Sequence, residues 1–260
     1  MDRPFNTDAQ VPRPALATAC RCALHGRRLF TGGLLGAGLA AALPASAVTI
    51  PECKRSTFTK AVSAQQVEQQ AGLQYRQMLQ KASGDRALAP ADHPQLQRLK
   101  YIGARIVPFT HDCNDRAAGW QWEVNLIGSR QINAFCMPGG KIAFYFGILE
   151  QLQLSDDEVA MIMGHEMTHA LREHARERMG KTMATRGAIE VGAAIFGLGG
   201  LSRLAADMGG QLLTLKFGRE DESEADLVGI ELAARAGYDP RAGVTPWQKM
   251  AAANKNAPPQ

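Results

Sequence analysis

The segment H-E-x-x-H at residues 165–169 constrains this chain more than any other feature. Residues four apart on a helix lie one above the other, so a helical segment projects His165 and His169 from one face. Two imidazoles one turn apart can hold a single Zn²⁺, at about 2.0–2.1 Å from each nitrogen. Glu166 lies about 100° around the helix from His165, beside such an ion. This position suits a general base that acts on a water molecule.

The same three residues can also be ordinary core or surface residues, because H-E-x-x-H arises by chance. The neighbouring side chains decide between the two interpretations. They cover most of the helix circumference with apolar groups: Val159, Met161, Ile162, Met163, Met167, Ala170 and Leu171. Ionisable groups in a buried helix are costly unless a partner replaces the lost water, and a metal ion is such a partner. We therefore interpret the segment as a zinc site.

A catalytic zinc site needs a third protein ligand and keeps its fourth position open. Acidic residues cluster at 220–226, although such residues favour the first turn of any helix. On a helical wheel at about 100° per residue, Glu224 falls on the polar, solvent-facing side. Glu222 and Asp226 fall on the apolar side. We predict that Glu222 is the third ligand and that Asp226 accepts a hydrogen bond from a liganding histidine.

The start of the metal-binding helix is marked by a capping box at Ser155–Glu158, with acidic residues in the first turn. The helical pattern continues through Arg178, where the sequence becomes polar. On a continuous helix His174 lies about 180° from His165. We therefore predict that His174 is a surface residue and not a ligand.

The segments before this helix predict a mostly helical α+β fold. Two scaffold helices are expected, over residues 63–83 and from about Asp92 to Pro108. Extended segments near 120–126, 131–137 and 141–146 then predict a small antiparallel sheet packed beside the metal-binding helix. An edge strand of this sheet can pair with an extended peptide through backbone hydrogen bonds. The pattern does not identify which strand forms the edge.

A Gly- and Ala-rich segment at residues 184–217 follows the metal-binding helix. Glu190, Arg203 and Asp207 interrupt its apolar residues, which leaves no stretch long enough to span a membrane. We expect two tightly packed helices with a glycine break near residues 197–200.

The first 47 residues have the pattern of an export signal. The pair Arg27–Arg28 precedes an apolar run from Leu34 to Leu43, and Ala45–Ala47 forms an A-x-A cleavage site. Both a twin-arginine signal and an ordinary secretory signal explain the pattern. We expect export to the periplasm or cell envelope with cleavage near Ala47. The expected organisation is an export signal over 1–47, a linker over 48–62, a single metallopeptidase domain over 63–255 and a disordered tail over 256–260.

Without the export segment the chain is nearly neutral. That segment holds five arginines and two aspartates, and the remaining chain carries 24 basic and 23 acidic residues. This balance gives no support for binding to nucleic acid or to an anionic membrane surface. The remaining chain keeps three cysteines, so at most one intramolecular disulfide can form. The spacing does not identify the pair among Cys53, Cys113 and Cys136.

Three ordered motifs carry a resemblance to a known family. H-E-x-x-H at 165–169, followed by E-S-E-A-D-L-V-G at 222–229, resembles the gluzincin endopeptidases of the HtpX, LoiP and CAAX prenyl endopeptidase type. N-A-F-C-M-P-G-G at 133–140 resembles the strand and turn that precede the metal-binding helix in bacterial periplasmic members.

The resemblance implies a zincin-like metalloprotease core with these roles: His165, His169 and Glu222 as zinc ligands, Glu166 as the base, and Asp226 in support. It also implies that Asn133 and Ala134 lie along the substrate cleft. Arg219 precedes the acidic cluster, where its side chain can interact with a tetrahedral oxyanion or only pair with nearby acids.

Together these features predict a zinc-dependent endopeptidase that binds one Zn²⁺ per chain and cleaves envelope proteins in protein quality control. The expected partners are unfolded or misfolded protein substrates and the outer-membrane assembly machinery, and not nucleic acid. An alternative is a zinc-bearing envelope chaperone or assembly factor with little proteolysis. A purely structural zinc protein needs a fourth Cys or His ligand, and none stands at a suitable spacing.

Overall fold

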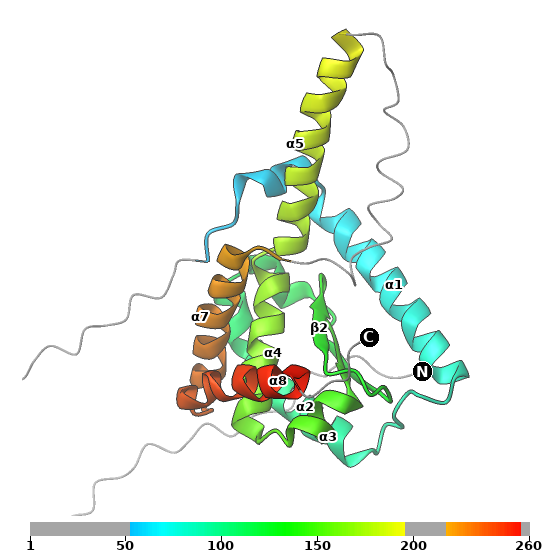
Figure 1. Ribbon diagram of the computed structural model, residues 1–260, viewed down its shortest axis with the longest axis vertical. Coiled ribbons are helices and arrows are strands. Elements are labelled where there is room, and N and C mark those ends of the chain that lie inside the picture. The colour runs from blue at the N-terminus through cyan, green and yellow to red at the C-terminus, as the bar shows by residue number, and fades with distance from the viewer. Residues whose placement is uncertain (1–52, 196–216, 256–260) are drawn as a thin grey trace, which may run out of the picture. The chain divides into compact units, whose positions relative to one another are not determined.

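Helix α4 (Asp156–Leu171) contains the H-E-x-x-H segment and lies between a small sheet and helix α7 (Arg219–Arg235) (Figure 1). The computed structural model describes residues 53–195 and 217–255. The other helices and strands are α1 (Ala64–Gly84), α2 (Pro94–Ile106), β1 (Glu123–Ile127), β2 (Ala134–Met137), β3 (Lys141–Tyr145), α3 (Phe146–Leu152), α5 (His174–Ile195) and α8 (Thr245–Lys255). Short 3-10 helices are η1 (Thr57–Ala61), η2 (Val107–Asp112), η3 (Asp115–Gly119) and η5 (Pro240–Gly243).

The mostly helical α+β fold is confirmed, but the sheet is mixed and not antiparallel. Its strand order is β1-β3-β2, in which β1 pairs with β3 in parallel and β2 pairs with β3 antiparallel. Gly139 and Gly140 close the β2–β3 turn with φ values of 85° and 77°, a left-handed conformation that favours glycine. Alternating side chains show that a segment is extended, but strand direction depends on which strands pair.

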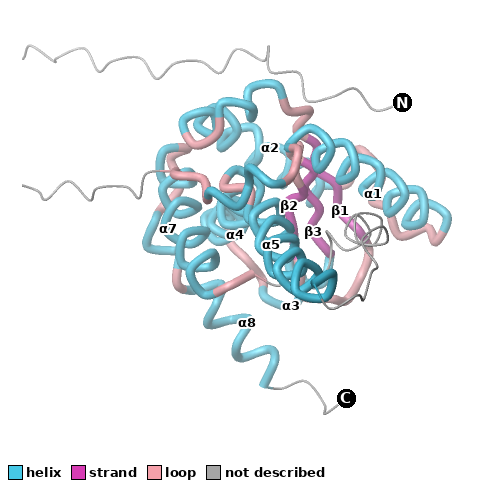
Figure 2. The backbone as a smooth tube through the Cα atoms, turned by 90° about the horizontal axis from the view of Figure 1, so that it is seen from above, coloured by secondary structure: helices cyan, strands magenta, loops and turns pink. Residues whose placement is uncertain are grey.

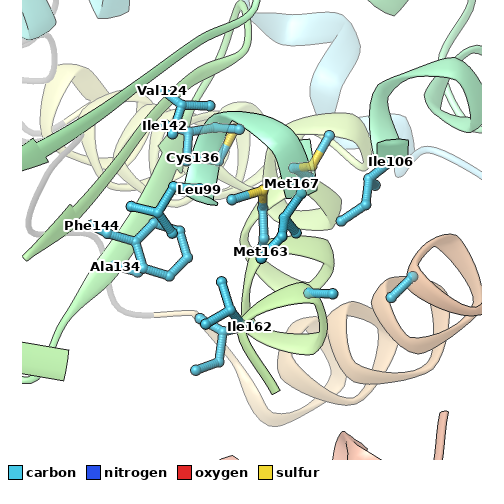
Figure 3. Close-up of a cluster of buried hydrophobic side chains, with 14 of the residues drawn as sticks. Leu99, Ile106, Val124, Ala134, Cys136, Ile142, Phe144, Ile162, Met163 and Met167 are labelled. Atoms are coloured by element: carbon cyan, nitrogen blue, oxygen red, sulfur yellow. The ribbon is translucent and has the colours of Figure 1, made fainter. Parts of the chain in front are cut away.

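Side chains alternate between two apolar faces of the sheet. Ile142 and Phe144 of β3 face a core formed with α2 and α4, whereas Ala143 faces α1. Figure 2 shows α1 and α4 on opposite sides of the strands, and Figure 3 shows methionines of α4 packed toward β3. The hydroxyl of Tyr75 on α1 donates a 2.5 Å hydrogen bond to the carbonyl of Ile142. The sheet therefore supports α4 from one side, and α1 covers the opposite face.

The predicted scaffold helices are present as α1 and α2. Trp120 and Trp122 of the predicted extended segment are buried, although β1 begins only at Glu123. The capping box is also present: the hydroxyl of Ser155 accepts from the N–H of Glu158, whose carboxylate accepts from the N–H of Ser155.

The predicted continuation of the metal-binding helix to Arg178 is wrong. Helix α4 ends at Leu171, and Glu173 has a φ of 60°. This left-handed conformation costs a non-glycine residue on the order of 1–3 kcal/mol. The buried carboxylate of Glu173 holds the turn by pairing with three arginines, which are Arg55, Arg116 and Arg176. Helix α5 then begins at His174, which is buried, contrary to the prediction of a surface residue.

Helices α4 and α7 touch through their backbones at two glycines. A methyl group built on Gly229 would lie 2.5 Å from the backbone nitrogen of His165, and one built on Gly164 would collide with the carbonyl of Gly229. Only glycine permits so close an approach. This contact brings the H-E-x-x-H segment next to the acidic start of α7.

A disulfide joins Cys53 to Cys113, and Cys136 is free and buried. The disulfide links the segment before η1 to the end of η2, and η1 packs against α5.

No helix among the described residues combines the length and apolar character needed to cross a bilayer. The expectations for residues 1–47, 197–200 and 256–260 lie outside the described residues.

We expect Gly229→Ala to lower the free energy of unfolding by about 1–3 kcal/mol, because the added methyl group separates α4 from α7. Chemical denaturation in the presence of a chelator measures this effect on the metal-free protein. Gly84→Ala is the matched control, since a methyl group there meets no atom within 4 Å. Equal stability of the two variants would contradict the packing argument.

We expect Cys53→Ser to lower the free energy of unfolding by about 2–4 kcal/mol, because the lost cross-link closes a loop with a sequence separation of 60. Thermal unfolding under oxidising and reducing conditions tests this. Reduction should destabilise the parent protein and leave the variant unchanged. A parent protein that is insensitive to reduction would show that the bond does not contribute.

Candidate metal centre

The two histidines of the H-E-x-x-H segment direct the same ring nitrogen to one point. The Nε2 atoms of His165 and His169 are 3.1 Å apart, and both side chains are buried. Glu222, on the first turn of α7, adds a carboxylate. Its Oε2 lies 3.5 Å from Nε2 of His165, and its Oε1 lies 3.9 Å from Nε2 of His169. Residues from two separate helices therefore present three donor atoms to a common point.

These separations fit a tetrahedral zinc site. With Zn–N distances of about 2.0–2.1 Å, neighbouring donors of a tetrahedron lie about 3.3 Å apart. Two imidazoles and one carboxylate are also the ligand set of a class of catalytic zinc sites that keep one position open. The side chain of Glu222 is 47% exposed, so the centre is accessible from the α7 side while its histidines are buried.

Each histidine is held through its other ring nitrogen. Nδ1 of His165 lies 2.8 Å from Oδ1 of Asp226, one turn after Glu222. Nδ1 of His169 lies 2.9 Å from Nδ1 of His174. Such contacts fix the ring orientation of a metal-binding histidine and direct its Nε2 lone pair.

Two aromatic rings line the histidines. Phe217 stacks on His169 with ring centroids 4.1 Å apart, and Trp247 of α8 meets His165 edge-on at 4.8 Å. An ion pair of 2.8 Å between Lys249 and Glu158 attaches α8 to the first turn of α4. These rings exclude water from the sides of the imidazoles and leave the Glu222 side accessible.

Burial and neighbouring charges set the protonation of the two imidazoles in opposite directions. Burial opposes a charge on His165, but the carboxylates of Asp226 and Glu222 outweigh it and raise its pKa to about 9. Burial and the neighbouring histidines lower the pKa of His169 to about 2. Because a metal binds neutral imidazole, a metal ion bound here near neutral pH would displace a proton from His165.

Glu166 is half-buried and follows the first histidine directly. Burial raises the pKa of its carboxyl to about 7; the negative charge of Glu222 acts in the same direction and His165 opposes it. A carboxylate with a pKa close to neutral can both accept and return a proton.

The structure brings together His165, His169, Glu222 and Asp226, all of which the sequence singled out. Asn133 is exposed directly before β2, and the side chain of Ala134 is buried. Arg219 is exposed at the first residue of α7, where its carbonyl accepts a 2.9 Å hydrogen bond from Ser223.

Four residues around the centre were not predicted from the sequence: His174, Phe217, Glu224 and Trp247. The helical wheel places Glu224 on the solvent-facing side, yet this carboxylate accepts hydrogen bonds of 3.0 and 2.6 Å from Arg172 and lies 3.3 Å from Nε2 of His174. A helical wheel gives the angle of a side chain but not the neighbours that lie there. The sequence feature that could have indicated His174 is its position as a further histidine five residues after His169.

A helix with two convergent imidazoles, joined by a carboxylate from a later helix, defines the class of His₂Glu metallopeptidases. Residues 95–256 match Peptidase family M48. This match covers more than half of the chain, and the chain belongs to that family.

Several curated relatives align with the same region. Mitochondrial metalloendopeptidase OMA1 of Schizosaccharomyces pombe is 33% identical over 171 residues, which are 65% of this chain and 48% of the relative. Metalloprotease LoiP of Escherichia coli is 28% identical over 178 residues, 67% of each chain. The beta-barrel assembly-enhancing protease of Yersinia pestis is 28% identical over 178 residues, 64% of this chain and 35% of the relative. The chain thus spans about half or less of the OMA1 and Yersinia relatives.

We expect Glu222→Ala to lower zinc affinity more than about 100-fold, since it removes a donor atom, whereas loss of a supporting contact costs about 10–100-fold. Competition with a chromophoric chelator measures the affinity. Ser223→Ala is the control, because it changes the adjacent exposed residue on the same helix. An unchanged affinity in the Glu222 variant would remove this residue from the metal centre.

Proposed function

We propose that this chain is a zinc-dependent endopeptidase that hydrolyses peptide bonds of envelope proteins. The convergence of His165, His169 and Glu222 beside Glu166 carries the proposal, because it supplies a metal site and a base in one place. Membership of Peptidase family M48 supports it, as do the metalloendopeptidase and protease names of the relatives.

His165, His169 and Glu222 would hold the ion in this mechanism, and Asp226 orients His165. Zinc held there would supply Lewis-acid chemistry, polarising the scissile carbonyl and lowering the pKa of a water molecule. The aromatic rings of Phe217 and Trp247 keep the imidazoles in place during the reaction.

Glu166 performs the proton transfers. Its carboxylate accepts a proton from the attacking water and returns it to the amine of the departing peptide. A pKa of about 7 suits both steps, because the group is neither a very weak base nor a very weak acid at neutral pH.

The edge strand β2 offers a binding site for an extended substrate. The N–H of Tyr145 bonds to the carbonyl of Asn133, so residues 133, 135 and 137 form the hydrogen-bonded pairs with β3. The backbone groups of Ala134 and Cys136 therefore point away from β3, and β2 packs directly against α4. We propose that a peptide pairs with this edge and that Asn133 and Ala134 lie along its path.

Unfolded or misfolded segments are the substrates that this geometry favours, because strand addition needs an extended backbone. A Cys53–Cys113 disulfide is typical of an oxidising compartment, which agrees with export by residues 1–47. We place the protein in the periplasm or cell envelope, with a role in protein quality control. The Yersinia relative is named a beta-barrel assembly-enhancing protease, and we extend the proposal to the assembly of outer-membrane proteins.

Within family M48, we assign the chain to the HtpX, LoiP and CAAX prenyl endopeptidase type. Its H-E-x-x-H and E-x-x-x-D motifs and the N-A-F-C-M-P-G-G segment at 133–140 support the assignment.

We expect Glu166→Gln to retain zinc and lose casein hydrolysis by about 10²–10⁴-fold, because the amide cannot accept the water proton. Metal analysis and an assay on unfolded casein measure the two quantities. Glu150→Gln, at an exposed position of α3, is the control and should keep full activity. Equal hydrolysis by Glu166→Gln and the parent protein would rule out this mechanism.

The same variant separates proteolysis from a chaperone function. A zinc-bearing chaperone or assembly factor would still complement a deletion strain when it carries Glu166→Gln. An endopeptidase that acts through Glu166 would not.

A further inference from the structure

Arg172 and Glu173 interrupt the helical path between α4 and α5. Helix α4 ends at Leu171, Glu173 adopts its left-handed conformation, and α5 begins at His174. This turn places His174 against His169, five residues earlier in sequence. Only 1% of the His174 side chain is exposed, and its Nδ1 lies 2.9 Å from Nδ1 of His169.

The direction of this hydrogen bond follows from the position of the metal centre. Nε2 of His169 faces the other two donors, so it must offer its lone pair there. A neutral imidazole carries its single proton on the other nitrogen, which is Nδ1. His169 therefore donates from Nδ1, and Nδ1 of His174 has to accept.

The second ring nitrogen of His174 satisfies this requirement. Because Nδ1 accepts, the proton of neutral His174 lies on Nε2. Nε2 lies 3.3 Å from Oε2 of Glu224, a carboxylate that accepts and never donates when ionised. Arg172 donates two further hydrogen bonds to the same oxygen, which holds Glu224 in place.

We propose that His174 is a positioning residue of the metal centre, which accepts a hydrogen bond from His169 and is itself oriented by Glu224. It would do for the second histidine what Asp226 does for the first. The inference rests on the proposed metal centre and adds a second supporting chain to it, running from His169 through His174 and Glu224 to Arg172.

This assignment accounts for every acid in the E-S-E-A-D motif. Glu222 faces both imidazoles at the metal centre, Asp226 contacts His165, and Glu224 contacts His174. It also accounts for the histidine in H-E-x-x-H-x-x-x-x-H, which the proposed mechanism leaves without a role.

The test compares zinc affinity in two variants of His174. His174→Phe keeps a ring of similar size but removes the acceptor, and we expect about 10–100-fold weaker zinc binding. His174→Asn places an amide oxygen near the position of Nδ1, and we expect affinity within about threefold of the parent protein. Chelator competition measures the affinity of the full chain, and the absorption spectrum of the Co²⁺-substituted proteins reports the ligand geometry.

Glu220→Gln is the control: it removes an exposed negative charge from the first turn of α7, which also carries Glu222, and should leave zinc affinity unchanged. If the Phe variant does not fold, His174→Gln takes its place, since its longer amide reaches toward Glu224 and leaves His169 without an acceptor. Weak binding by Phe or Gln together with recovery by Asn supports the proposal. Parent-like affinity in all variants, or an equal loss in all of them, overturns it. Absence of zinc binding by the parent protein overturns the metal centre itself.

Discussion

The close contact between α4 and α7 is the constraint on which the rest of the structure depends. Gly164 directly precedes His165, the first of the two proposed histidine ligands, and Gly229 lies two turns after Glu222. Backbone meets backbone at this pair, so no side chain separates the two helices near the metal centre. A carboxylate has a short reach, and only this approach allows Glu222 to lie within 4 Å of both imidazoles. The glycines therefore act on the site through helix spacing and not through any chemistry of their own.

Burial then determines how the charged groups behave. The imidazoles are removed from water, which is costly unless each ring nitrogen has a partner. Asp226 and His174 supply those partners on the protein side, and a metal ion would supply them at Nε2. Burial also brings the pKa of Glu166 to about 7. The same packing that orients the proposed ligands thus prepares the proposed base.

Much of the centre could be predicted from the sequence because its geometry is local. One helical turn relates His165 to His169, and another relates Glu222 to Asp226, so periodicity alone places each pair on one face. The position of His174 was not predictable in this way. It depends on a left-handed Glu173, whose cost is offset by arginines that lie far apart in the sequence. The prediction of an antiparallel sheet was wrong for the same reason, because the direction of a strand depends on which distant segment it pairs with.

The turn at Glu173 links the outer part of the fold to the centre. Arg116 connects Glu173 to Glu68 on α1, and Arg55 approaches Glu173 from the segment that follows the disulfide residue Cys53. The adjacent residue is His174, which contacts His169. Interactions made outside the candidate metal centre therefore determine where His174 lies. Through Arg55, the cross-linked segment before α1 thus contacts the turn that places His174 against His169.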